Sequence, residues 1–157
     1  MTKEQIITKL PYSKPFLFVD ELLNINENGV EGTYTFNDNL DFYKGHFKDN
    51  PVTPGVILTE VMAQIGVVCL GIYLLNDTFN SNISIALTSN EIDFLKPVFP
   101  KEKVTVTSEK IYFRFSKLKC KVEMKNEKGE VVCSGTIAGM IVSSPQPSPK
   151  EREPKLK

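Results

Sequence analysis

The apolar segment 56–75 places the strongest constraint on how this chain can fold. Its sequence, VILTEVMAQIGVVCLGIYLL, has only three polar side chains, and as an α-helix it would be about 30 Å long. That length is enough to cross a membrane, but Glu60 and Gln64 interrupt its first half and leave an uninterrupted apolar run only from Ile65 to Leu75. We therefore expect a helix buried inside a soluble domain, with other elements covering almost all of its sides.

Short strands on both sides of this segment can provide that cover. Before it, residues 15–25 and 30–36 flank an Asn28-Gly29 turn and predict a hairpin. After it, alternation of apolar and polar residues predicts four more strands. These are expected around residues 83–94, 104–115, 118–124 and 130–142. The expected fold class is α+β, with one antiparallel sheet of about six strands wrapped around one long buried helix.

The chain length of 157 residues fits one domain. At its start, Thr2 and Gln5 form a capping-box pattern, which predicts a short helix that Pro11 ends. Residues 143–157, SSPQPSPKEREPKLK, are rich in proline and lysine and have almost no apolar residues. We predict a single domain over residues 1–142 and a disordered tail over residues 143–157.

The charges balance overall but are segregated along the chain. Nineteen basic and nineteen acidic residues give a net charge of zero, which argues against nucleic-acid binding and against binding to an anionic membrane. Residues 1–95 nevertheless carry 5 basic and 12 acidic side chains, whereas residues 96–121 carry 8 basic and 2 acidic ones. The simplest interpretation of this basic band is a solvent-facing strand surface that carries lysines.

The cysteine and histidine content predicts no metal site and no cofactor. The three cysteines form no C-x-x-C pair and lie among apolar residues, so we expect buried reduced thiols. The first residues have no apolar stretch before a cleavage site, and we therefore expect a cytoplasmic protein.

The long irregular segment 37–54 is the first candidate for a functional region, because at about 18 residues it exceeds the usual length of a loop. It contains His46, the only histidine of the chain, and Glu60 is the only acidic residue of the apolar helix. A neutral imidazole can accept a proton, and a carboxyl group in hydrophobic surroundings can stay protonated and donate one. The pair predicts acid–base chemistry, although each residue alone also has a purely structural explanation.

The start of the apolar helix has features that suit ligand binding. Pro54 fits the first turn of a helix, and Gly55 allows a ligand to approach the backbone closely. The unpaired N–H groups of a first turn can stabilise a carbonyl oxygen that gains negative charge, although Pro54 and Gly55 also serve as plain helix punctuation. Gln64 follows Glu60 by one turn, where its amide can hold the Glu60 carboxyl by a hydrogen bond.

Three stretches of the sequence carry a resemblance to a known family. They are PFLFVDELL, FYKGHFKDNPVTPGVILTEVMAQ and IDFLKPVFP, and the part from His46 to Gln64 is the most specific. Over about residues 10–142 the chain resembles the β-hydroxyacyl–acyl carrier protein dehydratases of fatty-acid synthesis. The resemblance implies the hotdog fold, in which the sheet wraps the helix.

The same resemblance implies a reaction and its residues. The reaction is dehydration of a 3-hydroxyacyl thioester on acyl carrier protein to the trans-2-enoyl thioester, in fatty-acid or related acyl or polyketide biosynthesis. His46 and Glu60 would be the catalytic pair, brought together from different protomers of a dimer. The Gly55 amide would donate to the thioester carbonyl. Further residues are implied at the substrate site, Phe47 and Val56, and as its supports, Gln64 and Pro54.

The implied partners are acyl carrier protein and other copies of the chain, as a homodimer or a trimer of dimers. Because acyl carrier proteins are acidic, the basic band can attract one through Lys96, Lys101, Lys103 and Arg114. Lys48-Asp49 stands where the family usually has Pro-Gly directly after His-Phe. Three alternatives stay open: a hotdog acyl thioesterase, a hydratase that acts on coenzyme A thioesters, and a non-catalytic carrier-binding subunit, which the Lys48-Asp49 difference keeps open.

Overall fold

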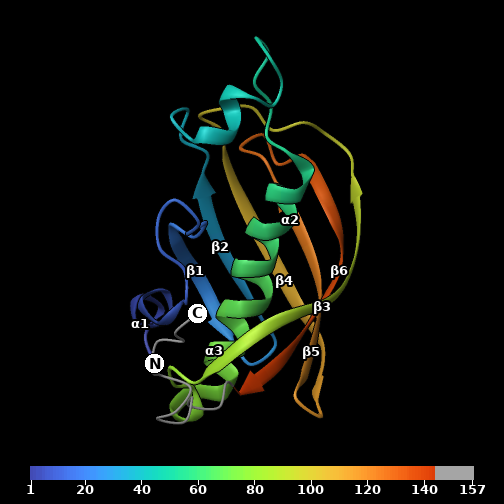
Figure 1. Ribbon diagram of the computed structural model, residues 1–157. Helices are drawn as coiled ribbons and strands as arrows, with labels where there is room; N and C mark the ends of the chain where they lie inside the picture. Colours follow the sequence, from blue (N-terminus) through green and yellow to red (C-terminus); the bar gives the residue numbers. More distant parts are fainter. Residues whose placement is uncertain (144–157) are drawn as a thin grey trace, which may run out of the picture.

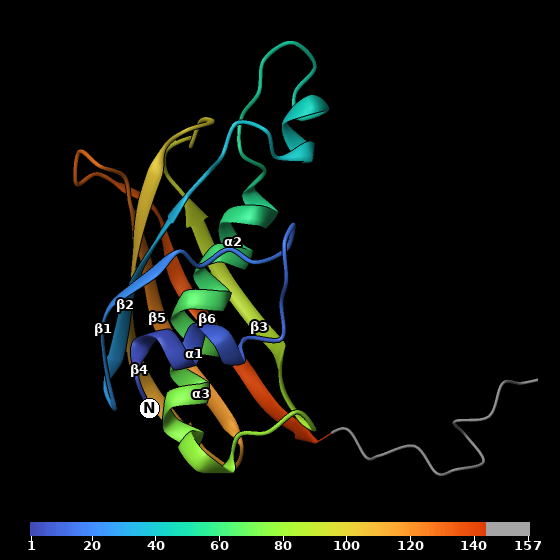
Figure 2. The same cartoon turned by 90° about the vertical axis from the view of Figure 1, so that its left-hand side faces the viewer.

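The protein, described over residues 1–143 by a computed structural model, is a six-stranded antiparallel sheet curled around one long helix (Figures 1 and 2). The strands lie in the order β1-β2-β4-β5-β6-β3. Their bounds are β1 Glu21–Asn26, β2 Gly29–Thr35, β3 Ile83–Phe94, β4 Lys103–Arg114, β5 Lys117–Lys125 and β6 Val131–Ser143. The predicted α+β hotdog architecture is confirmed. The predicted tail lies outside the described residues except for Ser143, which is the last residue of β6 instead.

The central helix is built from three segments rather than one. An α-helix, α2 (Gly55–Ala63), passes into a π-helical segment, Gln64–Cys69, and then into a second α-helix, α3 (Leu70–Leu75). The sequence predicted the extent of this helix but not its π-helical middle. A π-helical turn shifts the hydrogen-bond ladder of a helix, and here the Ser108 hydroxyl of β4 donates to the Gly66 carbonyl at 2.8 Å.

This helix forms the core of the molecule. The stretch Gly55–Thr78 is long and apolar enough to cross a membrane by composition, but 72% of its most apolar window is buried inside the protein. The sheet provides the cover, because its strands turn one face inward: in β5 the buried side chains alternate with lysines and a glutamate. Those inward residues are Leu118, Cys120, Val122 and Met124. The structure therefore favours the core helix over the membrane span.

The N-terminal residues cover one side of the helix. Helix α1 (Lys3–Lys9) begins with the predicted capping box, in which the backbone N–H of Gln5 donates to Thr2 Oγ1 at 3.1 Å. The predicted start of the first strand at Pro15 is wrong, because β1 begins at Glu21. Gln64 accepts a hydrogen bond from the Phe18 N–H and donates to the Phe16 carbonyl, so this backbone is paired with a helix side chain instead of a strand.

Strand β3 forms one edge of the sheet. Within residues 1–143 its only neighbour in the sheet is β6, so its other side has no partner strand. The register shifts between Leu87 and Ser89, which accounts for the broken alternation of its sequence. Two large apolar side chains on β3 stay exposed, Leu87 at 49% and Phe94 at 52%. A long edge strand with exposed apolar side chains is a template for pairing with another strand.

The close approach of β3 and β6 depends on Gly135. A Cβ atom at this position would lie 1.9 Å from the carbonyl oxygen of Glu91 in β3. Gly135→Ala is therefore expected to lower the free energy of unfolding by about 1–3 kcal/mol, because two strand backbones must move apart. Denaturant unfolding measures the change. Gly45→Ala is the control, since a Cβ there meets no atom within 4 Å, and equal losses in the two variants would contradict the expectation.

Candidate active site

His46 belongs to the segment between β2 and α2, which lies beyond the N-terminal end of the central helix (Figure 1). Backbone hydrogen bonds fix the loop on both sides of the histidine. The His46 backbone N–H donates to the Phe42 carbonyl at 3.0 Å, and the Val52 N–H donates to the His46 carbonyl at 2.9 Å. The Thr53 N–H donates to the Val98 carbonyl at 2.8 Å and ties the loop to the segment between β3 and β4. The position of His46 is thus set by the fold.

The hydrogen bond of the His46 ring determines which nitrogen is free. Nδ1 lies 2.9 Å from the Val52 carbonyl oxygen, which can only accept, so Nδ1 carries the proton of the neutral ring. Nε2 then holds the free lone pair and can act as a base. The Phe47 ring stacks on the imidazole at 4.1 Å between centroids and restricts its rotation.

Glu60 projects from α2 and is half-buried. Its Oε2 accepts a hydrogen bond from Gln64 Nε2 at 2.9 Å, the bond that the spacing of the two residues predicts. Within residues 1–143, Oε1 has no hydrogen-bond partner. When the carboxyl is protonated, its proton therefore belongs on Oε1, because Oε2 is occupied as an acceptor.

Gln64 is completely buried and all its polar atoms are used. Its Oε1 accepts from the Phe18 N–H at 2.9 Å, and its Nε2 donates to the Phe16 carbonyl at 3.0 Å as well as to Glu60. This arrangement determines the orientation of the amide, since only the nitrogen can donate. Gln64 thus fixes the Glu60 carboxyl against the segment before β1.

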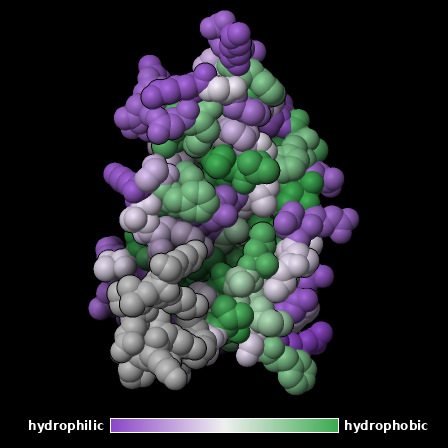
Figure 3. All heavy atoms as spheres, in the orientation of Figure 1, coloured by the Kyte–Doolittle hydropathy of each residue, from purple (hydrophilic) through white to green (hydrophobic). Residues whose placement is uncertain are grey.

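A cavity of about 180 Å³ lies beside Glu60. Among residues 1–143 most of its wall is apolar, and the only polar side chain besides Glu60 is Tyr12, for which the sequence predicts no role. The apolar lining comes from Phe16, Ala63, Val67, Val68, Ile85 and Leu87. Figure 3 shows hydrophobic side chains gathered along the middle of the face that bears the central helix. Since an apolar cavity of about 150 Å³ holds a benzene molecule, this one can hold a short apolar chain.

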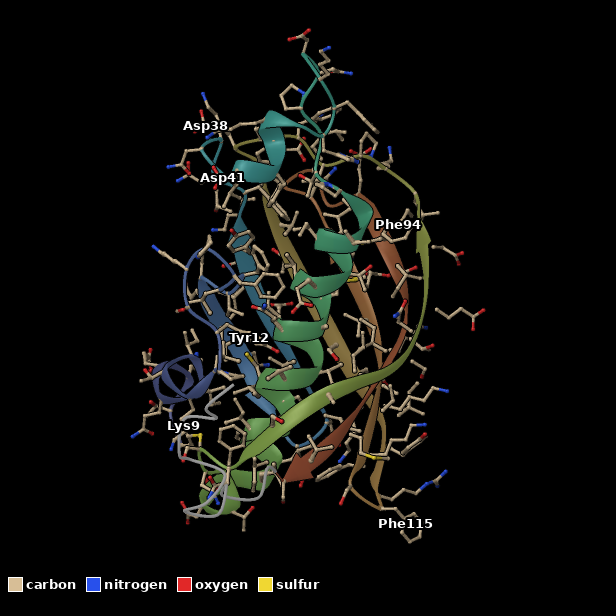
Figure 4. All side chains as sticks on the ribbon, viewed as in Figure 1. Lys9, Tyr12, Asp38, Asp41, Phe94 and Phe115 are labelled. Carbon is tan, nitrogen blue, oxygen red and sulfur yellow. The ribbon has the colours of Figure 1, made fainter. Side chains whose placement is uncertain are left out.

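The start of α2 offers two free backbone donors. The first turn is not capped by a side chain, and its first hydrogen bonds run from the Ile57 and Leu58 N–H groups to the Pro54 carbonyl. Within residues 1–143, the N–H groups of Gly55 and Val56 therefore have no acceptor. A Cβ on Gly55 would lie 3.3 Å from the Phe94 ring, which extends toward this end of the helix (Figure 4). The two N–H groups can bind a carbonyl oxygen.

The two proposed catalytic side chains do not meet within one chain. In residues 1–143 no hydrogen bond or ion pair joins His46 to Glu60, and His46 is not part of the cavity wall. Two residues expected at the substrate site are exposed, Phe47 at 57% and Val56 at 77%. Within one chain, the two candidate catalytic residues are therefore separate.

The four basic residues that were expected to attract an acidic carrier protein, Lys96, Lys101, Lys103 and Arg114, do not lie together. Lys103 and Arg114 lie at opposite ends of the twelve-residue strand β4. Lys96 forms an ion pair with Glu130 at 2.6 Å, and this hydrogen bond lowers the pKa of Glu130. Lys101 forms an ion pair with Asp38 at 3.6 Å. Arg114 stacks over the Tyr112 ring at 4.3 Å.

The described residues include no group of three or more His, Cys, Asp or Glu side chains that could hold a metal ion. The three cysteines are free and buried. Burial raises the pKa of Cys120 to about 11 and that of Cys133 to about 12, so both remain neutral thiols at neutral pH.

Comparison with known proteins adds a family to this geometry. Residues 10–138 match the family model described as a FabA-like domain. A curated 3-hydroxyacyl-[acyl-carrier-protein] dehydratase FabZ from Caldicellulosiruptor bescii is 33% identical over 135 residues, which are 85% of this chain and 94% of that protein. The FabZ of Herpetosiphon aurantiacus is 34% identical over 146 residues, covering 90% of this chain and 99% of that protein.

Solved structures with low sequence identity share the fold. The dehydratase heterocomplex ApeI:P from Xenorhabdus doucetiae superposes with a TM-score of 0.73 at 14% identity, covering 96% of this chain and 95% of that chain. A thioesterase from Haemophilus influenzae gives a TM-score of 0.66 at 15% identity, with coverages of 91% and 92%. Because these neighbours include both a dehydratase and a thioesterase, the fold alone does not choose the reaction.

Proposed function

The chain belongs to the FabA-like family, and we propose that it removes water from a 3-hydroxyacyl thioester on acyl carrier protein to give the trans-2-enoyl thioester. The observation that carries this proposal is the Glu60 carboxyl, held by Gln64 with one oxygen free beside an apolar cavity. A dehydratase needs an acid beside an acyl chain and a base near the same carbon atoms. His46, with a free Nε2, supplies the base.

In the first step the thioester carbonyl accepts hydrogen bonds from the Gly55 and Val56 N–H groups at the start of α2. Their partial positive charge stabilises the enolate that forms when Cα loses a proton. His46 Nε2 takes that proton, and the Val52 carbonyl, bonded to Nδ1, stabilises the imidazolium that results.

In the second step the bond between C3 and its hydroxyl oxygen breaks. The Glu60 carboxyl gives its Oε1 proton to this oxygen, which leaves as water, while the electrons of the former Cα–H bond form the Cα=Cβ double bond. His46 then carries the extra proton and Glu60 is a carboxylate, so a return of one proton from His46 to Glu60 completes the cycle. Gln64 holds Oε2 throughout and leaves Oε1 free.

A second copy of the chain completes the site in this proposal, with His46 of one protomer facing Glu60 of the other. Three features support this arrangement: the separation of His46 from Glu60 within one chain, the unpaired edge of β3, and the exposed apolar residues on β3 and at the start of α2. Pairing of two β3 edges gives a two-fold symmetric dimer with two equivalent sites. The homodimer is therefore the smallest active unit that we propose.

The carrier protein would meet the surface next to the His46 loop. The segment 96–103 is held against this loop by the bond from Thr53 to Val98 and by the ion pair of Lys101 with Asp38. Lys101 and Lys103 lie there, and an acidic carrier protein that delivers its acyl chain to the start of α2 would pass them. Of the basic band, only Lys101 and Lys103 would contact the carrier protein.

Mass spectrometry of the product tests the reaction. The protein is incubated with a panel of 3-hydroxyacyl thioesters of increasing chain length on acyl carrier protein. The mass of each thioester is measured before and after the incubation. We expect the acyl group to become lighter by one water molecule while the thioester stays intact. Release of the free acid would instead identify a thioesterase, and an unchanged substrate in every case would identify a subunit without catalysis.

A further inference from the structure

Within residues 1–143, Tyr12 is the one polar side chain that shares the cavity with Glu60. It lies on the segment between α1 and β1, beside the central helix (Figure 4), and its ring contacts the Phe16 ring with 6.1 Å between centroids. The bond from Gln64 to the Phe16 carbonyl ties this segment to the same helix that bears Glu60. The two polar groups therefore reach the cavity from elements that are held together.

The Tyr12 hydroxyl is an unused hydrogen-bond donor. Within residues 1–143 it has no hydrogen-bond partner, and no completely buried side-chain nitrogen or oxygen in this part of the chain lacks one. Because the Tyr12 hydroxyl has no such partner, it is not completely buried, and Tyr12 itself is part of the cavity wall. Burial, and after it the Glu60 carboxylate, raise the pKa of Tyr12 to about 12, so the group keeps its proton at neutral pH.

The content of the cavity determines what this donor can bind. An apolar acyl chain displaces water from the cavity and would leave the Tyr12 hydroxyl without a partner, which is unfavourable. Near Glu60 a 3-hydroxyacyl chain carries one oxygen, the 3-hydroxyl, that can accept a hydrogen bond from Tyr12 while Glu60 protonates it.

We propose that the Tyr12 hydroxyl donates a hydrogen bond to the substrate 3-hydroxyl, so that Tyr12 is a second substrate-binding catalytic residue beside Glu60. The inference rests on the proposed dehydration. Tyr12 keeps its own proton: Glu60 supplies the proton, the C3–O bond breaks and water leaves. The hydrogen bond from Tyr12 selects acyl chains that carry the 3-hydroxyl and orients the leaving oxygen toward Glu60.

The test compares Tyr12→Phe with the wild-type protein on two ligands of the same chain length. One is the 3-hydroxyacyl thioester, for which kcat/KM is measured. The other is the saturated acyl thioester, measured as a competitive inhibitor. We expect kcat/KM to fall roughly 2- to 12-fold, the effect of one neutral hydrogen bond, while the saturated thioester binds at least as tightly as to the wild-type protein, because phenylalanine leaves no hydroxyl without a partner. Phenylalanine retains the ring that contacts Phe16.

Tyr73→Phe is the matched control, because Tyr73 is half-buried on α3 and is not part of the cavity wall. It should leave both constants at their wild-type values. If Tyr12→Phe changes neither constant, or weakens both ligands equally, Tyr12 only fills space and the inference is wrong. If the wild-type protein forms no enoyl thioester, the proposed function fails, and this inference fails with it.

Discussion

His46→Ala is expected to lower kcat for dehydration by about 10²- to 10⁴-fold while the protein stays folded. The reason for the loss is that no other imidazole exists in the chain to take the Cα proton. The reason for the retained fold is that His46 is only half-buried and its side chain makes one hydrogen bond, to the Val52 carbonyl. The backbone bonds of the loop, which do not involve the imidazole, remain in place.

Glu60→Gln is expected to have an effect of the same size for a different reason. The amide oxygen of glutamine can still accept from Gln64 Nε2, so the local hydrogen bond is retained, but the group has no acidic proton for the leaving hydroxyl. Steady-state formation of the enoyl thioester measures activity, and thermal unfolding measures stability. Glu27→Gln, in the exposed turn between β1 and β2, is the control and should be fully active. Near wild-type turnover by either catalytic variant would rule out our assignment.

Much of the fold could be predicted because burial is encoded locally. The near absence of polar side chains in residues 56–75 predicts a core helix, and the alternation in residues 118–124 predicts a strand with one inward face. The irregular pattern between Leu87 and Ile92 is harder to interpret, since a bulge shifts the pairing of β3 with β6. The late start of β1 was not predictable, because it results from bonds between Gln64 and backbone that lies 46 and 48 residues away in the sequence.

The candidate site divides in the same way. The hydrogen bond between Glu60 and Gln64 follows from a spacing of one helical turn and was predicted. The place of Tyr12 in the cavity wall could not be predicted, because Tyr12 reaches the cavity only when the segment before β1 folds over the helix. The basic residues of segment 96–121 are close in sequence but are spread out in space, because Lys103 and Arg114 stand at opposite ends of an extended strand of twelve residues.

The surface around the site fits our proposal that a second chain completes it. The start of α2, strand β3 and the residue after β3 expose several apolar side chains, although residues 61–72 of the central helix are all buried. They are Val56, Leu87, Phe94 and Leu95. An exposed apolar group of this kind next to an unpaired strand edge is typical of an interface between subunits. If this interface joins two copies of the chain, it can bring His46 of one protomer to Glu60 of the other.

Mixing two inactive variants tests this arrangement directly. Co-expression of His46→Ala and Glu60→Gln chains in equal amounts is expected to restore about a quarter of wild-type activity, since each site draws its His46 and its Glu60 independently from two protomers. Each variant alone serves as the control and should be almost inactive. Because a site built within one chain would always lack one of the two groups, no activity in the mixture would show that the pair is not shared. A recovery near one quarter cannot arise from contamination by either inactive parent, so it would identify the dimer as the catalytic unit.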